Sequence, residues 1–265
     1  MNATDAQLDE IVDVLLGAER DRRDIGRLTT DRPWLDVEAA YRAQERQRDR
    51  RSAAGDPSIG AKLGLTSRAK QQRMGIASPL TGFLTHAMAL PAGAPIPLDE
   101  LIHPRVEPEI VFVLGERLAG PGVTAATALG AVASVHAGLE IIDSRYRDFD
   151  FALPDVIADN ASSARFVVSA RGVAPIGLDL VLEACVLRHN GEVVDTATGA
   201  AVQGNPFEAL ALAANDLARR GAALEAGSIV LTGGLTDAIP LTRGDTVSVE
   251  FASLGALAVR GGDSQ

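Results

Sequence analysis

The chain has 265 residues, of which 46% are hydrophobic and 23% charged, a composition typical of one large globular domain or of a small domain beside a larger one. Acidic residues outnumber basic ones by 35 to 25, which argues against nucleic-acid binding because that function needs a concentrated basic face. The single cysteine, Cys185, excludes an intrachain disulfide and a cysteine–zinc cluster.

No targeting signal is visible. The first ten residues, MNATDAQLDE, lack the basic and apolar segments of a signal peptide, and no apolar run approaches the roughly 20 residues of a membrane span. We therefore expect a cytoplasmic protein without membrane contact. An acidic protein that binds an acidic substrate needs a local cation to do so, which makes a metal site of interest.

Two amphipathic helices are predicted near the start of the chain. Apolar residues follow helical spacing over residues 5–22 and again over residues 36–52. The second segment ends in the polar stretch ERQRDRRSAAGD, which we interpret as a solvated helix face because acidic residues dilute its positive charge.

From about residue 60, short apolar runs alternate with glycine and proline, which indicates strands. Asn190-Gly191 predicts a hairpin turn, and residues 245–261 alternate as a second hairpin does. A helix is predicted over roughly Thr124–His136. A later helix should begin at Pro206, with Asn205 as its N-cap and a capping box to Glu208. The fold class is α+β, with a helical N-terminal region at residues 1–75 and a β-rich catalytic domain at residues 76–265.

Two carboxylates begin the apolar strand IVFVL. Glu107 and Glu109 lie two apart, so their side chains share one face of the strand, with Cα atoms roughly 6.5 to 7 Å apart. Buried together they would repel each other and lose hydration. Three remedies are open: a bound cation, a shared proton, or exposure at the end of the strand.

A third carboxylate favours the cation. Glu140 stands immediately before Ile141 and Ile142, so a glutamate also leads a second apolar run. Three carboxylates that converge from two strands form an oxygen-only site suited to Mg²⁺ or Mn²⁺.

The motifs HPRVEPE, GLEIIDSRYRDFDF and VIADNASSARF, in this order, resemble the hydratase/decarboxylase branch of the fumarylacetoacetate hydrolase superfamily. The resemblance continues in IGAKLGLTSRAKQQRMGIASPLTGFL and AGSIVLTGGLTDAIPLTRGDTV and covers nearly the whole chain. It implies helices followed by a mixed β-sandwich-like roll, with Mg²⁺ or Mn²⁺ held by Glu107, Glu109 and Glu140. Lys62 matches the active-site lysine of this family.

The branch includes two activities on a small 2-oxo acid. One is a lyase that decarboxylates 2-oxo-3-hexenedioate (4-oxalocrotonate), and the other is a hydratase of its product, 2-hydroxypenta-2,4-dienoate. Hydratases tend to carry a lysine and an aspartate where this chain has Ala61 and Leu80, so the resemblance favours the decarboxylase. The alternatives are the hydratase, a hydrolase of a related acylpyruvate, and a non-catalytic partner subunit. The branch also implies a homo-oligomer and a complex with a homologous hydratase.

Other site residues are predicted less directly. Arg165 could hold the distal carboxylate of a diacid or form a salt bridge to Asp159 or Asp143. Asp159 could act at the catalytic site or cap a loop. The hydroxyls of Thr232 and Thr236, with Leu80, are candidates for substrate binding, and a strand-to-loop bend is the alternative for the two threonines.

Two positions depart from the pattern of the family. Pro108 replaces an amide donor between the paired glutamates, so the strand is expected to be an edge or to bulge there. Asp237 stands where relatives have a small residue, which would change the preferred substrate if its side chain faces the pocket.

Overall fold

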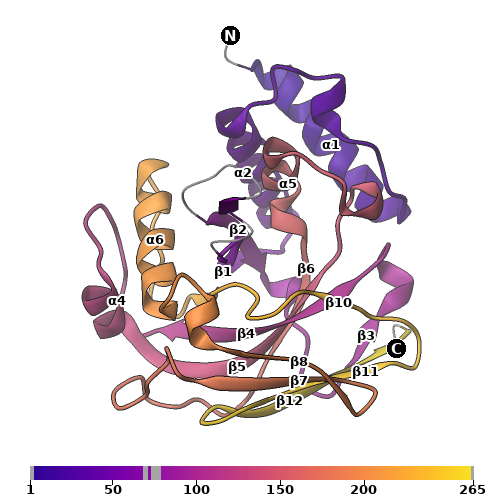
Figure 1. Ribbon diagram of the computed structural model, residues 1–265. Coiled ribbons are helices and arrows are strands. Elements are labelled where there is room, and N and C mark those ends of the chain that lie inside the picture. Colours follow the sequence, from indigo (N-terminus) through magenta and orange to yellow (C-terminus); the bar gives the residue numbers. More distant parts are fainter. Residues whose placement is uncertain (1–2, 68–70, 73–78, 264–265) are drawn as a thin grey trace.

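A computed structural model describes residues 3–67, 71–72 and 79–263. Within these residues the chain forms helices packed on two β-sheets (Figure 1). The helices are α1 (Asp5–Asp21), α2 (Val37–Ala53), α4 (Ala125–Ala131), α5 (Leu153–Ala158) and α6 (Pro206–Arg219). No helix in the described ranges is long and apolar enough to cross a membrane.

The first sheet carries the strands that build the site. Its order is β2-β1-β9-β4-β5-β6, and β10 pairs with β4 outside this path. Its strands are β1 (Ser58–Gly64), β2 (Leu80–Thr85), β4 (Arg105–Leu114), β5 (Val132–Ile142), β6 (Ser163–Val168), β9 (Ile229–Leu231) and β10 (Ile239–Pro240). All the described pairs of this sheet are antiparallel except β1 with β9, which run parallel.

The second sheet covers the other side of the core. Its order is β3-β12-β11-β7-β8, with β3 (Pro95–Pro97), β7 (Ala184–His189), β8 (Glu192–Thr198), β11 (Thr246–Phe251) and β12 (Gly255–Gly262). The main apolar core lies between the two sheets and under α6, where the ring of Phe112 on β4 stacks on Phe207 with centroids 4.9 Å apart. The fold class predicted from the sequence is confirmed.

The N-terminal helices form a smaller core of their own with α5, above β1 and β2 in the view of Figure 1. The charged end of α2 is not a freely solvated face, because three of its arginines, Arg46, Arg50 and Arg51, form ion pairs with acidic residues of α1. Buried Gln44 of α2 donates hydrogen bonds to the carbonyls of Thr81 (3.0 Å) and Ile157 (2.9 Å). This amide therefore ties the helices to β2 and to the end of α5.

The predicted helix over 124–136 is too long. The structure ends α4 at Ala131 and begins β5 at Val132. Gly130 is a weak helix former, and the β-branched side chains that follow it pack well on a sheet. In α6, the side chain of Asn205 caps the helix through the Phe207 N–H (3.0 Å), and not through the predicted capping box with Glu208.

Both predicted hairpins are present. Asn190 and Gly191 have φ angles of 51° and 88° in the β7–β8 turn, and β11 pairs with β12. Strand β1 falls inside the range 1–75 that was predicted to be helical, yet it is a member of the first sheet. The division into two domains at residue 75 stays a prediction, because that residue lies outside the described ranges.

Gly60 should be essential for the parallel pairing of β1 with β9. A Cβ atom at this position would lie 1.9 Å from the carbonyl oxygen of Ile229, a backbone atom that cannot move aside. We predict that Gly60→Ala lowers the free energy of unfolding by about 1–3 kcal/mol, as overpacking does. The matched control is Gly26→Ala, because a Cβ at Gly26 meets nothing within 4 Å. Equal denaturation midpoints for the two variants would contradict the prediction.

Candidate metal centre

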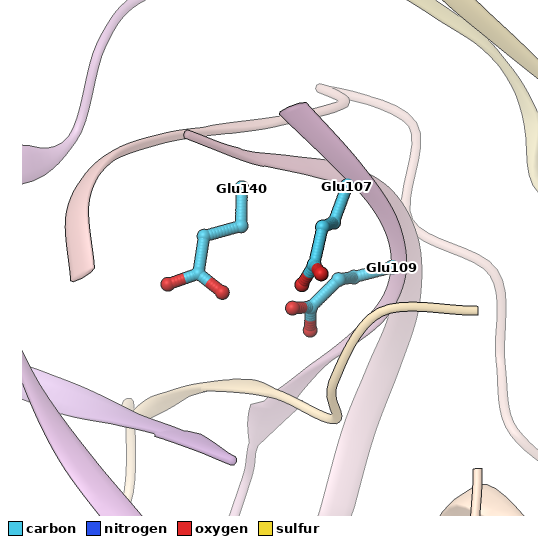
Figure 2. Close-up of side chains that lie close together, drawn as sticks. All are labelled: Glu107, Glu109 and Glu140. Carbon is cyan, nitrogen blue, oxygen red and sulfur yellow. The ribbon is translucent and has the colours of Figure 1, made fainter. Parts of the chain in front are cut away.

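The three predicted glutamates meet on one face of the first sheet (Figure 2). Strands β4 and β5 pair so that Glu107 stands directly opposite Glu140, and Glu109 follows two residues further along the same face. Each glutamate offers one oxygen, and these three oxygens lie within 4.8 Å of one another. Glu140 lies near the end of β5 and does not lead a strand as the sequence suggested.

Burial leaves part of this cluster without hydrogen-bond donors. Glu109 and Glu140 are fully buried. One oxygen of Glu109 accepts a hydrogen bond from the Gly233 N–H (2.6 Å), and one of Glu140 accepts from the Ser163 hydroxyl (2.9 Å). Of the other two oxygens, Glu109 Oε1 is buried without a hydrogen bond, and Glu140 Oε2, equally buried, has the Lys62 ammonium 3.1 Å away. Carboxylate oxygens in this condition fit a divalent cation, which would satisfy them together.

The pKa of Glu109 reflects both its burial and the charge of its neighbours. Burial raises this pKa well above its ordinary value, and the neighbouring charge of Glu140 raises it further. A cation would reverse this effect, because an opposite charge at the oxygens favours the ionised carboxylate.

Lys62 is the positive group beside the cluster. Its Nζ lies 3.1 Å from Glu140 Oε2 and donates a hydrogen bond to the Ala161 carbonyl (3.0 Å). Burial lowers the pKa of this amine, but the three glutamates together outweigh burial and raise it. The ammonium form of Lys62 is thus favoured by the glutamates, and it can act as a proton or hydrogen-bond donor. Its cross-strand neighbour is Gly82, where a Cβ would come within 3.1 Å of the lysine Cγ.

A left-handed backbone turn supports Lys62 from the opposite side. Asn160, Ala161 and Ser162 have φ angles of 49°, 52° and 58°, which cost non-glycine residues of order 1–3 kcal/mol each. The Asn160 side chain holds this turn to β2, since it accepts from the Phe83 N–H (2.8 Å) and donates to the Phe83 carbonyl (2.9 Å). The turn aims the Ala161 carbonyl at Lys62.

Asp159 anchors the same turn from behind. The Arg145 guanidinium donates to the Asp159 carboxylate and, at 2.6 Å, to its carbonyl oxygen. Burial raises the pKa of Asp159 to about 6, against the opposing effect of Arg145. Both side chains are buried, and Asp159 does not line the cavity described below. A direct catalytic role for Asp159, predicted from the sequence, has no support in this geometry.

Arg165 lies away from the cluster. It pairs across strands with Ile141, so it points to the face of the sheet opposite Glu140. Its guanidinium lies 2.6 Å from Glu100, and not on Asp159 or Asp143 as the sequence suggested. The register of β5 with β6, which the sequence does not reveal, decides this placement.

The hydroxyls of the two threonines that were predicted to bind substrate donate hydrogen bonds to backbone carbonyls instead. The Thr232 hydroxyl is fully buried and donates to the Ile110 carbonyl (2.8 Å), and the Thr236 hydroxyl donates to the Asp237 carbonyl (3.1 Å). Between them, Gly234 lies so close to Glu107 that a Cβ there would be 2.6 Å from its carboxylate. Because Gly234 has no side chain, the backbone of this loop can lie directly against the Glu107 carboxylate.

Pro108 neither bulges β4 nor lies on an edge strand. The pairing of β4 with β5 is regular from residue 105 to 113. The Pro108 carbonyl accepts from the Leu235 N–H (2.9 Å), so this residue turns its backbone groups away from β5. The proline therefore costs no hydrogen bond between the two strands that carry the glutamates.

A cavity of about 600 Å³ opens beside the cluster. Lys62 and Glu107 line it, with Leu80, Asp237 and Gly234. Its walls also include residues that the sequence analysis missed or left undecided: Arg105, Ile142, Phe149, Val156, Ala161 and Ser162. Strand alternation could have identified Arg105, since it lies two residues before Glu107 on the same face.

Comparison with known proteins agrees with this geometry. Residues 58–260 match the family described as fumarylacetoacetate (FAA) hydrolase, C-terminal. The chain belongs to the fumarylacetoacetate hydrolase family. A 4-oxalocrotonate decarboxylase from a Pseudomonas species is 42% identical over 92% of each chain, and a 2-keto-4-pentenoate hydratase from Paraburkholderia phymatum is 37% identical over 96% of this chain and 97% of its own.

The solved structures include a close neighbour. A 4-oxalocrotonate decarboxylase from Pseudomonas putida, complexed with magnesium and adipate, superposes with a TM-score of 0.96 at 38% identity and covers 98% of this chain and 99% of that one. The same enzyme has also been solved with calcium and acetate. The family fold therefore extends over the N-terminal helices as well as the two sheets.

Glu107 should be needed to bind a divalent cation but not to fold. We predict that Glu107→Gln weakens Mg²⁺ binding by tenfold or more, since metal sites depend on every anionic ligand. The denaturation midpoint should stay near that of the wild type, because the change removes one charge from a repulsive cluster. Isothermal titration with Mg²⁺ measures the first effect, and Glu116→Gln, at an exposed site after β4, is the control. Unaltered Mg²⁺ affinity in Glu107→Gln would show that the carboxylates are structural.

Proposed function

We propose that this protein is a metal-dependent lyase that decarboxylates 2-oxo-3-hexenedioate (4-oxalocrotonate) to 2-hydroxypenta-2,4-dienoate and CO₂. The observation that carries the proposal is the combination of a carboxylate cluster, a lysine paired with it and a cavity with both polar and apolar walls at the same place. The 42% identity to a 4-oxalocrotonate decarboxylase supports this choice of reaction, and adipate, the ligand of the solved relative, is a dicarboxylate of the expected class.

The chemistry needs few groups. The bond to the distal carboxylate breaks, and its electron pair moves through the conjugated alkene to the 2-oxo oxygen, which then takes up a proton. A divalent cation bound at Glu107, Glu109 and Glu140 would supply Lewis-acid stabilisation of the charge on that oxygen. Lys62, charged and held against the cavity wall, would donate a hydrogen bond or the proton.

Leu80 favours decarboxylation over hydration. Adding water requires an acid and a base placed near the reacting carbons, whereas losing CO₂ requires an electron sink. Leu80 lines the cavity where hydratases of this branch tend to have an aspartate. Ala61 carries less weight than its sequence position suggested, because residues 61 and 62 point to opposite faces of β1 and Ala61 belongs to the apolar core.

The second candidate is a hydratase of 2-hydroxypenta-2,4-dienoate, which the 37% identity to a 2-keto-4-pentenoate hydratase keeps open. A non-catalytic partner subunit is the third candidate, and that role gives no reason to keep three carboxylates together, two of them buried. A complex with a homologous hydratase and a homo-oligomer remain predictions, and co-purification and light scattering test them.

Purified protein should release CO₂ from 2-oxo-3-hexenedioate in the presence of Mg²⁺ or Mn²⁺. Chelation of the metal should stop turnover, and 2-hydroxypenta-2,4-dienoate should accumulate, as followed by its absorbance and by chromatography. If the protein instead consumes this dienoate and forms 4-hydroxy-2-oxopentanoate, the hydratase replaces the decarboxylase as the proposed function.

Lys62 should act in the transition state. We predict that Lys62→Met lowers kcat by about 100-fold or more, the typical contribution of a positioned proton donor. Mg²⁺ binding should persist, because the three carboxylates remain. A change confined to KM would assign Lys62 to uniform substrate binding. Titration of the variant with Mg²⁺ provides the control for an intact metal centre.

A further inference from the structure

We propose that Arg105 is the residue that recognises the distal carboxylate of the substrate and so selects dicarboxylates over monocarboxylates. This inference rests on the proposed function for the identity of the substrate, but its central test measures binding and not turnover. The role had been predicted for Arg165, whose guanidinium the structure places on Glu100, outside the cavity.

Arg105 lies at the right place along β4. It precedes Glu107 by two residues, so its side chain leaves the strand on the same face, roughly 7 Å from Glu107 measured between Cα atoms. Both residues line the same cavity. A chain-like acid with one end at the carboxylate cluster can therefore present its other end to Arg105. The cavity wall also includes the apolar side chains of Leu80, Ile142 and Phe149, which suit contact with a hydrocarbon chain.

Arg105 is a cation of the cavity wall that is available to bind a carboxylate of the substrate. Among the described residues that line it, the cations are Lys62 and Arg105. Lys62 is engaged by Glu140 and by the Ala161 carbonyl. Within the described part of the chain, the Arg105 guanidinium forms no hydrogen bond or ion pair, and its one specific contact is with an aromatic ring. An arginine fork without an anionic partner is suited to bind a carboxylate with two hydrogen bonds.

That aromatic ring holds the guanidinium in position. The central carbon of the Arg105 guanidinium lies 4.1 Å from the centroid of the Phe149 ring, and His103 packs against the same ring with centroids 5.0 Å apart. Asp148 and Phe149 both have left-handed φ angles, 56° and 57°, which are strained for residues other than glycine. A strained backbone that supports one stacked arginine is typical of a prepared binding site.

The chemistry predicts how the loss of Arg105 would affect kinetics. The distal carboxylate leaves as neutral CO₂, so its ion pair with Arg105 weakens as the reaction proceeds. An interaction stronger in the ground state than in the transition state contributes to binding and not to the rate of the chemical step. Arg105→Met should therefore raise KM for 2-oxo-3-hexenedioate while kcat stays constant or rises.

Two saturated acids that differ only at the distal end provide the direct test. 2-Oxohexanedioate has the second carboxylate and 2-oxohexanoate lacks it, and neither has the conjugated alkene needed for turnover. Titration of the Mg²⁺-loaded protein should show that Arg105→Met weakens the binding of 2-oxohexanedioate by roughly 10- to 100-fold, the range expected for a charge-assisted pair. The affinities for 2-oxohexanoate and for Mg²⁺ should stay unchanged.

Two further variants complete the test. Arg105→Lys keeps the charge but loses the fork and the stacking, so its loss of 2-oxohexanedioate affinity should be intermediate. It carries the test alone if Arg105→Met does not fold. Arg165→Met should not alter the preference between the two acids.

The proposal would be overturned if Arg105→Met weakened the binding of both acids equally. It would also be overturned if Arg165→Met, instead of Arg105→Met, abolished the preference for 2-oxohexanedioate over 2-oxohexanoate. Absence of CO₂ release together with an intact preference for 2-oxohexanedioate would remove the proposed function and leave the role of Arg105 standing.

Discussion

The structure of this site depends on holding three carboxylates together, two of them fully buried and the third at the cavity wall. Repulsion between Glu107, Glu109 and Glu140 and the loss of their hydration both oppose this arrangement. The groups that offset it come from separate parts of the fold: Lys62 from β1, the Gly233 N–H from the loop after β9, and the Ser163 hydroxyl from β6. The strand order around β4 is therefore a requirement of the cluster.

The backbone beside the cluster is arranged for the same purpose. The turn at residues 160–162 keeps three unfavourable φ angles because hydrogen bonds hold it on both sides. Asn160 is hydrogen-bonded to Phe83 of β2, and Asp159 to Arg145. Neither Asn160 nor Asp159 lines the cavity. They fix the Ala161 carbonyl against the lysine, and so they act on the site through the position of Lys62.

The features that local pattern encodes could be predicted from the sequence. Helical spacing identified α1 and α2, Asn190-Gly191 identified a hairpin, and the two-residue repeat identified the shared face of Glu107 and Glu109. Pairing between distant strands could not be predicted, because register depends on the whole sheet. This is why Arg165 was expected at the site and lies on the other face, while Arg105 was not considered.

The parallel pairing of β1 with β9 has a consequence for the order in which the site assembles during folding. Lys62 takes its position beside the glutamates only when β9, from the C-terminal part of the chain, has been inserted between β1 and β4. Closing so long a loop costs chain entropy before any contact compensates for it, so pairings of this kind form slowly. A nascent chain that has completed β4 and β5 contains all three glutamates, but it lacks the Gly233 N–H and has no β9 to place Lys62 beside them. The carboxylate cluster with its lysine is thus among the last parts of the molecule to assemble, and a chain truncated before β9 would lack the groups that offset the repulsion between the glutamates.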